Sequence, residues 1–537
     1  MNSERFNEEF RFGSAAWADQ HQLSAAGLFK PAGLPLGYFK NRMMRLDSDA
    51  PMITIAGAGS GKTRDLLGYV MCTTAHMPMM ILDPRGELSA ISLHTLAPAG
   101  TYGYFWNPMG ICDLPQHSCN PLDILDPNSP NFHTDLRFII EGLIPLPPGA
   151  KESYFILRAR DWVENIAKSR VERNGSISLP ELYTLINLIE TDTDKWADEL
   201  AVMFKSRFET VQRTAGEMLA KQQDAPREFG SVMGEVYAHF AFLNDPALQR
   251  ALERSDFSID CLVNPSRVAR VSLNVPAEYL GVWSPIVRIF FTVAMLVKSR
   301  RPEAKRVTLI CDEAGQLGRF EALLRAFTYG RGAGLRTWAL FQDVGQISRN
   351  FEAAAVQGFL GSAQVRQFFG VRDYETAQLV SNMLGHQTLL YDDEKAQADA
   401  RKRKGDALRK AFETGDAFSQ AHDYQHYERA SKMRSKQSRL IMTPSEVLSM
   451  PDDRQIAFIS GKNLNPVFGW KYPYYMRREL AGKYLPNPYH PPTDKVLIKT
   501  RLGTKWVNVH EGPVPYRYAD YPQYHSGRAV WVEGFPF

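Results

Sequence analysis

One stretch, residues 52–63, limits what this chain can fold into more than any other part of the sequence. It begins with the apolar and β-branched run Met-Ile-Thr-Ile and changes abruptly to small residues that end on Gly61-Lys62-Thr63. A loop that points backbone N–H groups at phosphate oxygens has little room for Cβ atoms, and the glycines of this stretch remove them. The pattern predicts a strand, a phosphate-binding loop and the start of a helix.

The residues that close the loop have specific expected roles. Lys62 would reach the β- and γ-phosphates and the Thr63 hydroxyl would hold Mg²⁺, so ATP and Mg²⁺ are the expected cofactors. Ala56 stands where the motif has its first glycine, which is the least disruptive replacement. The other interpretation is a glycine-rich turn that binds no nucleotide. The residues predicted to bind the nucleotide are Gly57, Ala58, Gly59, Ser60, Gly61, Lys62, Thr63 and Arg64.

A second chemical pattern lies far downstream, where the apolar run of residues 307–311 ends in Asp312 and Glu313. An ATPase of this kind needs one acid at a strand end for the Mg²⁺ shell and often a second to orient or deprotonate water. Asp312 fits the first role and Glu313 the second. Many strands end in acids, so this pattern alone is weak. Together, the acid pair and the phosphate-binding loop predict nucleotide hydrolysis.

Gln342 is a third candidate for the site. It ends the expected strand 335–342, which should lie beside the strand that carries Asp312. A side-chain amide at that position suits a residue that senses the γ-phosphate. The alternative is a solvated amide at a strand terminus.

The spacing of apolar residues along the sequence predicts an α/β fold with an inserted all-α domain. We expect a lead-in segment at 1–36 and a nucleotide-binding domain in two parts, 37–129 and 259–469, which an all-α domain at 130–258 interrupts. A basic insertion at 392–439 contains the run 401–410, which is either a DNA-contacting loop or a solvated, mobile one. The aromatic C-terminal extension, residues 470–537, should pack on the body, although aromatic residues among basic ones can also stack on bases.

Composition narrows the class of protein. The net charge is only +4 over 537 residues, so any nucleic-acid surface must come from local clustering. Five cysteines without metal-ligand spacing indicate reduced cytosolic thiols. The polar, acidic start lacks a secretory signal, and the longest apolar run, residues 282–297, falls short of the roughly 20 residues of a spanning helix. We expect a helix from about 285 to 298, no transmembrane segment and a cytoplasmic location.

With these motifs assembled, the sequence resembles the TraG/TraD-type coupling proteins of type IV secretion and conjugation systems, which are RecA-like P-loop ATPases related to FtsK-type DNA pumps. The resemblance runs from about residue 12 to residue 475 and rests on the segments 12–17, 26–28, 82–88, 120–122, 312–318, 330–336, 342–343 and 440–447.

The resemblance implies a RecA-like sheet, a hexamer that is active as a ring, and a catalytic set of Lys62, Glu313, Gln342 and Arg331, with Thr63 and Asp312 as metal ligands. Arg331 stands where family members carry an arginine proposed to reach the neighbouring subunit's nucleotide, and Arg336 is the competing candidate. The implied partners are single-stranded DNA or a relaxase–DNA complex, together with the channel ATPases and inner-membrane components of the secretion system.

Two departures from the family bear on these expectations. Family members usually begin with a pair of transmembrane helices, and this sequence begins where those would end. Either those helices have been removed, or this is a natural anchorless member that attaches to the inner membrane peripherally, through partners. Some relatives carry acidic tails that recruit cargo, whereas this extension is aromatic and basic.

We therefore expect an ATPase that drives DNA, or a DNA–relaxase or protein cargo, into a type IV secretion or conjugation channel. The alternative is a substrate-docking adaptor in which nucleotide is mainly structural. A cytosolic pump for double-stranded DNA would share the motor but not the segment at 12–28.

Overall fold

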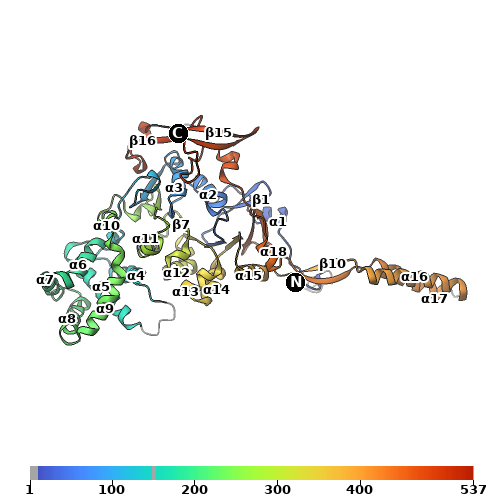
Figure 1. Cartoon of the computed structure of the whole chain (residues 1–537), viewed down its shortest axis with the longest axis horizontal. Helices are drawn as coiled ribbons and strands as arrows, with labels where there is room; N and C mark the ends of the chain where they lie inside the picture. The colour runs from blue at the N-terminus through green and yellow to red at the C-terminus, as the bar shows by residue number, and fades with distance from the viewer. Residues whose placement is uncertain (1–9, 148–152, 415–416, 536–537) are drawn as a thin grey trace. The chain divides into compact units, whose positions relative to one another are not determined.

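The computed structural model of the chain describes residues 10–147, 153–414 and 417–535 (Figure 1). The chain divides into two compact units. The larger contains Gln20–Val371 and Pro451–Phe537, and the smaller contains Met1–Asp19 and Arg372–Met450. The domain boundaries expected from the sequence stay predictions.

An eleven-stranded sheet forms the centre of the larger unit, in the order β2-β1-β13-β12-β9-β3-β8-β7-β4-β6-β5. From β9 to β5 all neighbouring strands are parallel, and from β9 to β2 they are antiparallel. The strands are β1 (Leu34–Phe39), β2 (Arg42–Leu46), β3 (Met52–Ala56), β4 (Met79–Leu82), β5 (Thr101–Trp106), β6 (Val268–Leu273), β7 (Val307–Cys311), β8 (Leu335–Phe341), β9 (Val365–Phe369), β12 (Arg454–Ile459) and β13 (Val467–Trp470).

The strands at the centre of the parallel part are apolar and fully buried, as expected for a sheet covered on both faces by helices. The predicted strand of the phosphate-binding loop is β3, and the acid-bearing strand is β7. One strand, β8, lies between them. Helix α1 (Gln20–Ala25) precedes the sheet, and the helices that follow its strands include α2 (Gly68–Thr73), α3 (Glu87–Ser92), α12 (Glu321–Tyr329), α13 (Val344–Phe351) and α14 (Ala353–Ser362).

Helix α11 (Leu280–Arg300) is the apolar helix of the core. It begins about five residues earlier than the sequence suggests and holds Pro285 inside it. By length and composition it could cross a membrane, but 78% of its most apolar window is buried within the protein. No other helix in the described ranges meets the same criteria. Burial of this kind is what a core helix of an α/β domain requires.

Between β5 and β6 the described residues form a helical insertion (green in Figure 1), as the periodicity of the sequence predicts. Its helices are α4 (Phe132–Leu143), α5 (Tyr154–Asn174), α6 (Leu179–Thr191), α7 (Thr193–Met203), α8 (Glu209–Asp224), α9 (Pro226–Phe240) and α10 (Pro246–Glu253). The insertion is tied to α11 by Arg288, whose Nε donates to the Gly142 carbonyl at 2.7 Å.

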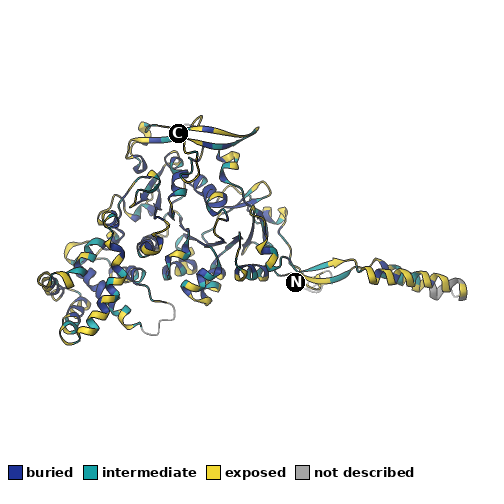
Figure 2. Ribbon diagram, in the orientation of Figure 1, coloured by how far each residue is buried: buried dark blue, intermediate teal, exposed yellow. Residues whose placement is uncertain are grey.

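The C-terminal extension packs on the body, as expected, and parts of its ribbon have the colour of buried residues in Figure 2. It contains the three-stranded antiparallel sheet of β14 (Lys495–Thr500), β15 (Gly503–Pro513) and β16 (Arg528–Val532). Tyr484 and Tyr524 are 2% and 3% exposed. Gln523 bonds the edge strand β5, accepting from the Gly103 amide at 2.8 Å and donating to the Thr101 carbonyl at 3.1 Å. The first part of this sheet edge is thereby covered, and His117 pairs with the strand further along, at Phe105 and Trp106.

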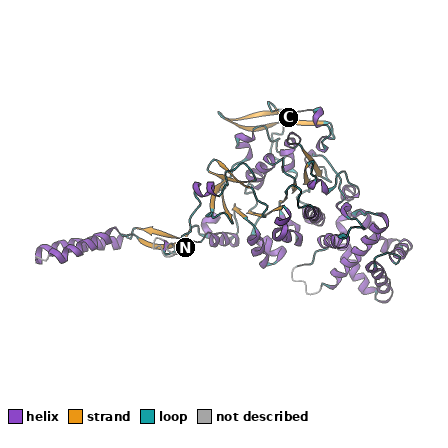
Figure 3. Cartoon of the chain, turned by 180° about the vertical axis from the view of Figure 1, so that it is seen from behind, coloured by secondary structure: helices purple, strands orange, loops and turns teal. Residues whose placement is uncertain are grey.

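The smaller unit places the basic run on a helix (Figure 3), where the sequence suggested a loop. Its elements are α15 (Tyr374–Leu384), β10 (His386–Tyr391), α16 (Glu394–Thr414), α17 (Ala417–Lys432), β11 (Ser435–Leu440) and α18 (Pro444–Leu448). Strands β10 and β11 pair antiparallel, and the helices α16 and α17 form a hairpin beyond them. Arg401, Lys402 and Arg403 are exposed on α16. A helix is favoured because lysine, arginine, alanine and leucine, all strong helix formers, make up most of the run.

Candidate active site

The loop after β3 has the conformation that its glycines predict. Gly59 and Gly61 have φ angles of 70° and 87°. A Cβ atom on Gly61 would come 2.3 Å from the Asp65 carboxylate, so both conformation and space require glycine there. The amide of Gly57 donates to the Gly370 carbonyl at 3.2 Å, which fastens the start of the loop to the end of β9. Residues 58–64 all line the cavity described below.

The strand order brings the predicted catalytic side chains together. Because β8 lies between β3 and β7, Gln342 at its carboxyl end stands between Lys62 and Glu313. The Lys62 ammonium donates to Glu313 Oε1 at 2.7 Å, and Gln342 Nε2 donates to Glu313 Oε2 at 2.9 Å. The Glu313 carboxylate is therefore held by both neighbours, on a residue whose own backbone is left-handed, with φ 56°. Non-glycine residues in this conformation often occur at functional sites.

Asp312 lies next to this cluster and is buried. Burial raises its pKa to about 7, Lys62 opposes the shift, and the charges of Glu313 and Asp83 add to it. Asp83 ends the adjacent strand β4, and burial raises its pKa to about 6. Its carboxylate accepts from the backbone amides of Leu88 and Ser89 at 3.3 and 2.7 Å, which caps α3. Asp312 and Asp83 are thus two buried carboxylates at neighbouring strand ends, and the ammonium of Lys62 opposes the rise in the pKa of Asp312 that burial causes.

These residues fit a Mg²⁺ ion. A carboxylate at a strand end and the Thr63 hydroxyl are oxygen ligands of the kind that Mg²⁺ prefers, and the ion usually completes its shell with water and phosphate oxygens. In keeping with that, the described residues contain no cluster of three or more His, Cys, Asp or Glu side chains arranged to hold a metal alone. The positive charge of the ion would also relieve the unfavourable burial of Asp312.

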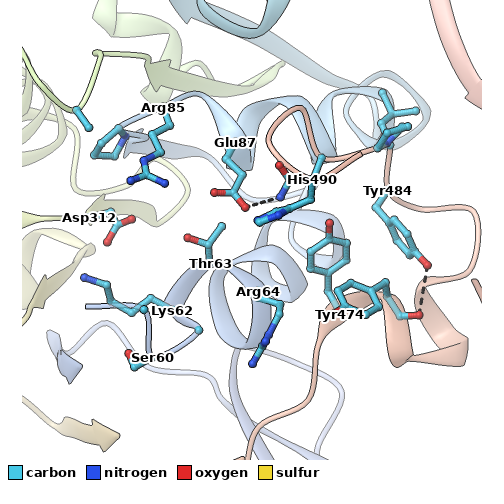
Figure 4. A pocket seen from close by; sticks show the side chains of 18 of the residues that line it. Ser60, Lys62, Thr63, Arg64, Arg85, Glu87, Asp312, Tyr474, Tyr484 and His490 are labelled. Atoms are coloured by element: carbon cyan, nitrogen blue, oxygen red, sulfur yellow. Dashed lines mark hydrogen bonds between the residues drawn. The ribbon is translucent and has the colours of Figure 1, made fainter. Parts of the chain in front are cut away.

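Lys62, Thr63, Asp312, Glu313 and Gln342 open into one cavity of about 960 Å³, which has two walls (Figure 4). The first wall is the carboxyl edge of the sheet, with Lys62, Thr63, Arg64, Arg85, Glu87 and Asp312. The second wall comes from the C-terminal extension, with Tyr474, Tyr475, Tyr484, Asn487, His490 and Trp506. Asn487 donates to the Glu87 carboxylate across the two walls, and the Tyr489 hydroxyl donates to the Arg85 carbonyl at 2.9 Å. The sequence did not indicate this second wall.

Lys471 is a further residue that sequence reasoning missed. It follows β13 directly, is 1% exposed, and donates from Nζ to the Ser60 carbonyl in the phosphate-binding loop at 2.8 Å. Its Nζ lies 3.6 Å from Asp65 Oδ2 and 4.0 Å from the centre of the Phe369 ring. Burial lowers its pKa to about 8. A lone lysine after a strand carries no recognisable pattern, so only the fold could reveal it.

The two arginine candidates occupy different surroundings. Arg331 is exposed on the turn η10 (Gly330–Ala333), which precedes β8 and so lies at the opposite end of that strand from Gln342. It is therefore distant from the cavity of its own chain. Arg336 is 1% exposed within β8, and its Nε donates to the Ser48 carbonyl at 2.6 Å. Burial argues against Arg336 as a side chain that reaches a neighbouring subunit.

Arg64 follows Thr63 and lines the cavity with a half-exposed side chain. Its Nε and Nη2 donate to the two Asp65 carboxylate oxygens at 2.6 and 2.9 Å, and this pairing is the main reason that its pKa is raised. The bidentate pair fixes the guanidinium plane at the floor of the cavity beside Tyr474 in Figure 4.

Comparison with known sequences gives one consistent family. A family model described as type IV secretory system conjugative DNA transfer matches residues 11–499. Protein VirD4 of Rhizobium radiobacter is 24% identical over 500 residues, which cover 89% of this chain and 66% of the relative. Conjugal transfer protein TraG of Escherichia coli is 22% identical over 512 residues, covering 85% and 73%. Against VirD4 of Rhizobium rhizogenes the matched region is 57% of the relative, so the chain spans less than two thirds of the VirD4 relatives.

Comparison with solved structures gives the fold. The unbound conjugative coupling protein TrwBdeltaN70 superposes with a TM-score of 0.59 at 15% identity, covering 86% of this chain and 95% of that one. Plasmid coupling protein TrwB in complex with ADP and Mg²⁺ gives a TM-score of 0.58 at 14% identity, covering 85% and 93%. These likenesses confirm the predicted RecA-like α/β fold.

Proposed function

This chain belongs to the type IV secretory system conjugative DNA transfer family, and we propose that it is an ATP-hydrolysing coupling protein. It would drive DNA, or a DNA–relaxase or protein cargo, into a type IV secretion or conjugation channel. The observation that carries the ATPase assignment is the contact of Glu313 with both Lys62 and Gln342 beside the buried Asp312. Three different strands supply these groups to one point, where a γ-phosphate and its attacking water would lie.

Each of these residues has a proposed role in hydrolysis. Lys62 moves from Glu313 to the β- and γ-phosphates, and Thr63 and Asp312 hold the metal. Glu313, released from the lysine, orients the attacking water and accepts its proton, while Gln342 keeps the glutamate in place and senses the γ-phosphate. Mg²⁺ supplies neutralisation of the charge that develops on the phosphate oxygens. The binding of ADP, Mg²⁺ and an ATP analogue by TrwB supports this assignment by analogy.

The active form in this proposal is a homo-hexamer, because Arg331 lies too far from its own cavity to act there. Supplied across an interface, its guanidinium would neutralise transition-state charge and make hydrolysis depend on assembly. The partners are single-stranded DNA or a relaxase–DNA complex, the channel ATPases and the inner-membrane components. The protein would work at the cytoplasmic side of the inner membrane through these partners. Its mass, measured with and without ATP and DNA, tests assembly: a monomer under every condition would contradict the role of Arg331.

Hydrolysis is tested with the purified chain at high concentration, with and without single-stranded DNA. We expect DNA-stimulated phosphate release that falls by at least about 10²-fold in Lys62→Ala, because a charge that stabilises the transition state is lost. Lys483→Ala, on an exposed lysine of the C-terminal extension, is the matched control and should retain full activity. Absence of hydrolysis, together with unchanged transfer in Lys62→Ala, would remove the motor assignment.

The second candidate function is a docking adaptor in which nucleotide only braces the fold. The observation that favours it is the cover that the C-terminal extension places over the cavity. DNA binding that weakens steeply with salt, together with DNA-stimulated turnover, separates the two functions, since an adaptor should have neither property.

A further inference from the structure

The second wall of the cavity contains more aromatic surface than phosphate binding requires. Tyr475, His490 and Trp506 line the cavity, and we call these three side chains the aromatic wall. Trp506 is 55% exposed although it is the largest side-chain type. An exposed tryptophan at the mouth of a cavity is an available stacking surface, since a tryptophan that served only packing would be covered.

Two of the three residues of the aromatic wall, Tyr475 and Trp506, are linked through Tyr484 and Leu497 behind them. Tyr484 is buried, and its hydroxyl donates to the Leu497 carbonyl and lies 3.4 Å from the Tyr475 carbonyl. Leu497 is in turn paired with Trp506 across β14 and β15. The wall is therefore attached to a hydrogen-bonded hairpin. A preformed surface costs little ordering entropy when a ligand binds.

The aromatic wall is also pressed against the first wall. Tyr474, the neighbour of Tyr475, is 5% exposed, and its ring packs against the helix that follows the phosphate-binding loop. A Cβ atom at Gly68 would come 2.7 Å from the Tyr474 ring. The glycine thus allows the C-terminal extension to approach the helix that begins at Lys62. The guanidinium of Arg64 lies at the same end of the cavity.

We propose that the aromatic wall binds the base of the nucleotide by stacking, with the Arg64 guanidinium on the side of the phosphate-binding loop. This inference rests on the proposed function, since it concerns the same ligand. A cavity of about 960 Å³ has room for a whole nucleoside triphosphate beyond its phosphates. Asn487, a polar group beside the wall, is already engaged, because it bonds both Glu87 and the Tyr489 amide. The aromatic rings of the wall offer stacking, which accepts any base with a π face.

The test compares two ligands of the full-length chain by calorimetry: Mg²⁺–ATP, which has a base, and Mg²⁺–tripolyphosphate, which has none. We expect the wild type to bind ATP at least tenfold more tightly. In the double variant Tyr475→Ala/Trp506→Ala this advantage should shrink to less than threefold while tripolyphosphate affinity is unchanged, since each lost base–aromatic stack is worth roughly a tenfold change or more. Tyr516→Ala is the matched control, because Tyr516 belongs to the same extension and is 97% exposed.

The outcomes separate this inference from the function on which it rests. If the wild type binds neither ligand, or Lys62→Ala binds both as tightly as the wild type does, the proposed nucleotide site itself fails. If tripolyphosphate binds and depends on Lys62, but ATP affinity is equal in the wall variant and in Tyr516→Ala, only the base site is wrong. Loss of single-stranded DNA affinity in the wall variant with ATP affinity intact would also overturn it, in favour of DNA bases as the ligand.

A second measurement guards against a variant that fails to fold. Trp506 fluorescence should be quenched when Mg²⁺–ATP is added and unchanged by Mg²⁺–tripolyphosphate. In Trp506→Phe, which keeps a stacking ring, the quenching should disappear and ATP affinity should stay within about threefold of the wild type. Quenching of equal size in Trp506→Phe would show that the base lies near another tryptophan and would overturn the proposal.

Discussion

The two walls of the cavity differ in how they are built. The first wall consists of strand ends from one parallel sheet, so its charged groups are placed by hydrogen-bonded register and by the order of β3, β8 and β7. The second wall is a chain segment more than 400 residues downstream of the loop it faces, as the Lys471–Ser60 bond illustrates, with a sequence separation of 411. In the proposed function, the sheet therefore supplies the groups that act on the phosphates, whereas the extension covers the cavity in which they lie.

The sharpest separation of chemistry from binding should come from Glu313→Gln in the first wall. The amide keeps the shape of the side chain and a partner for Gln342, but it cannot accept a proton from water. We expect turnover to fall by about 10²- to 10⁴-fold with nucleotide affinity retained. Single-turnover phosphate release and equilibrium binding measure the two effects. Glu321→Gln is the matched control, because Glu321 pairs with Arg319 and does not line the cavity. Normal turnover in Glu313→Gln would assign the water to another residue.

The first wall should also respond to pH through Asp312. A carboxylate must be deprotonated to hold Mg²⁺, and the pKa of Asp312 is raised to about 7. Because the neutral acid dominates below that value, Mg²⁺-dependent nucleotide affinity should fall about tenfold from pH 8 to pH 6. Lys62, Glu313 and Asp83 are the charged groups that face it. Calorimetry in buffers of different ionisation enthalpy measures the released proton.

The control for this pH dependence is Asp312→Asn. It should bind Mg²⁺–nucleotide weakly and with a flat profile between pH 8 and 6.5. Below that range Asp83, whose pKa is raised to about 6, becomes protonated as well. A profile in Asp312→Asn that matches the wild type would contradict the assignment of the proton to Asp312.

Lys471 joins the two walls, and Lys471→Met tests whether that link is functional. Loss of the bond to Ser60 should loosen the phosphate-binding loop and weaken binding of ATP and tripolyphosphate alike, by about fivefold, which is the weight of one hydrogen bond of about 1 kcal/mol. An effect on ATP alone would place Lys471 with the base-binding surface instead. Lys462→Met, on a lysine of the β12–β13 connection, serves as the control.

Lys471 also gives a stability prediction: although its loss should weaken ligand binding, it should not lower the stability of the fold at neutral pH. Its pKa is about 8 in the folded protein and 10.5 in the unfolded chain. Between these values the unfolded state binds more protons, so the free energy of unfolding should rise with pH, by at most about 1.4 kcal/mol per unit. Below pH 8 the charged lysine costs the folded state its full penalty, and Lys471→Met should be as stable as the wild type or more so. Denaturant unfolding at pH 7 and pH 9 measures the difference.

The smallest expected effect is that of Gly68→Ala, which changes the spacing between the walls. The added methyl group would meet the Tyr474 ring and the Thr63 carbonyl, at 2.7 and 2.9 Å. Displacement of Tyr474 should weaken ATP binding two- to fivefold, with less effect on tripolyphosphate. Gly230→Ala, where a Cβ atom meets nothing within 4 Å, is the matched control. An equal loss for both ligands would indicate that the loop, and not the aromatic wall, had moved.

Local pattern placed Lys62, Thr63, Arg64 and Asp312 of the first wall in segments that follow buried strands, whereas Arg85 and Glu87 were not predicted for the site. The apolar runs before Lys62 and Asp312 mark buried strands, and parallel strands present their carboxyl ends on one edge. The contact of Lys62 with Glu313 was not predictable, since it depends on β8 lying between their strands.

The second wall could not be predicted, because aromatic density says that a segment will be buried but not what it will cover. The basic run at 401–410 was expected in a loop, since its charge and Gly405 obscured a helix that its lysines and arginines favour. Lys471 shows no local pattern at all. The roles of the individual site residues and the domain boundaries stay predictions.

Gln523 has a consequence for any shortened form of this protein. Its side-chain amide occupies the Gly103 amide and the Thr101 carbonyl of β5, as a neighbouring strand would. A chain that ended before this residue would leave the last strand of an eleven-stranded sheet with open hydrogen-bonding groups. Such an edge recruits strands from other molecules. We therefore expect the C-terminal extension to limit self-association at this edge, in addition to forming a wall of the cavity.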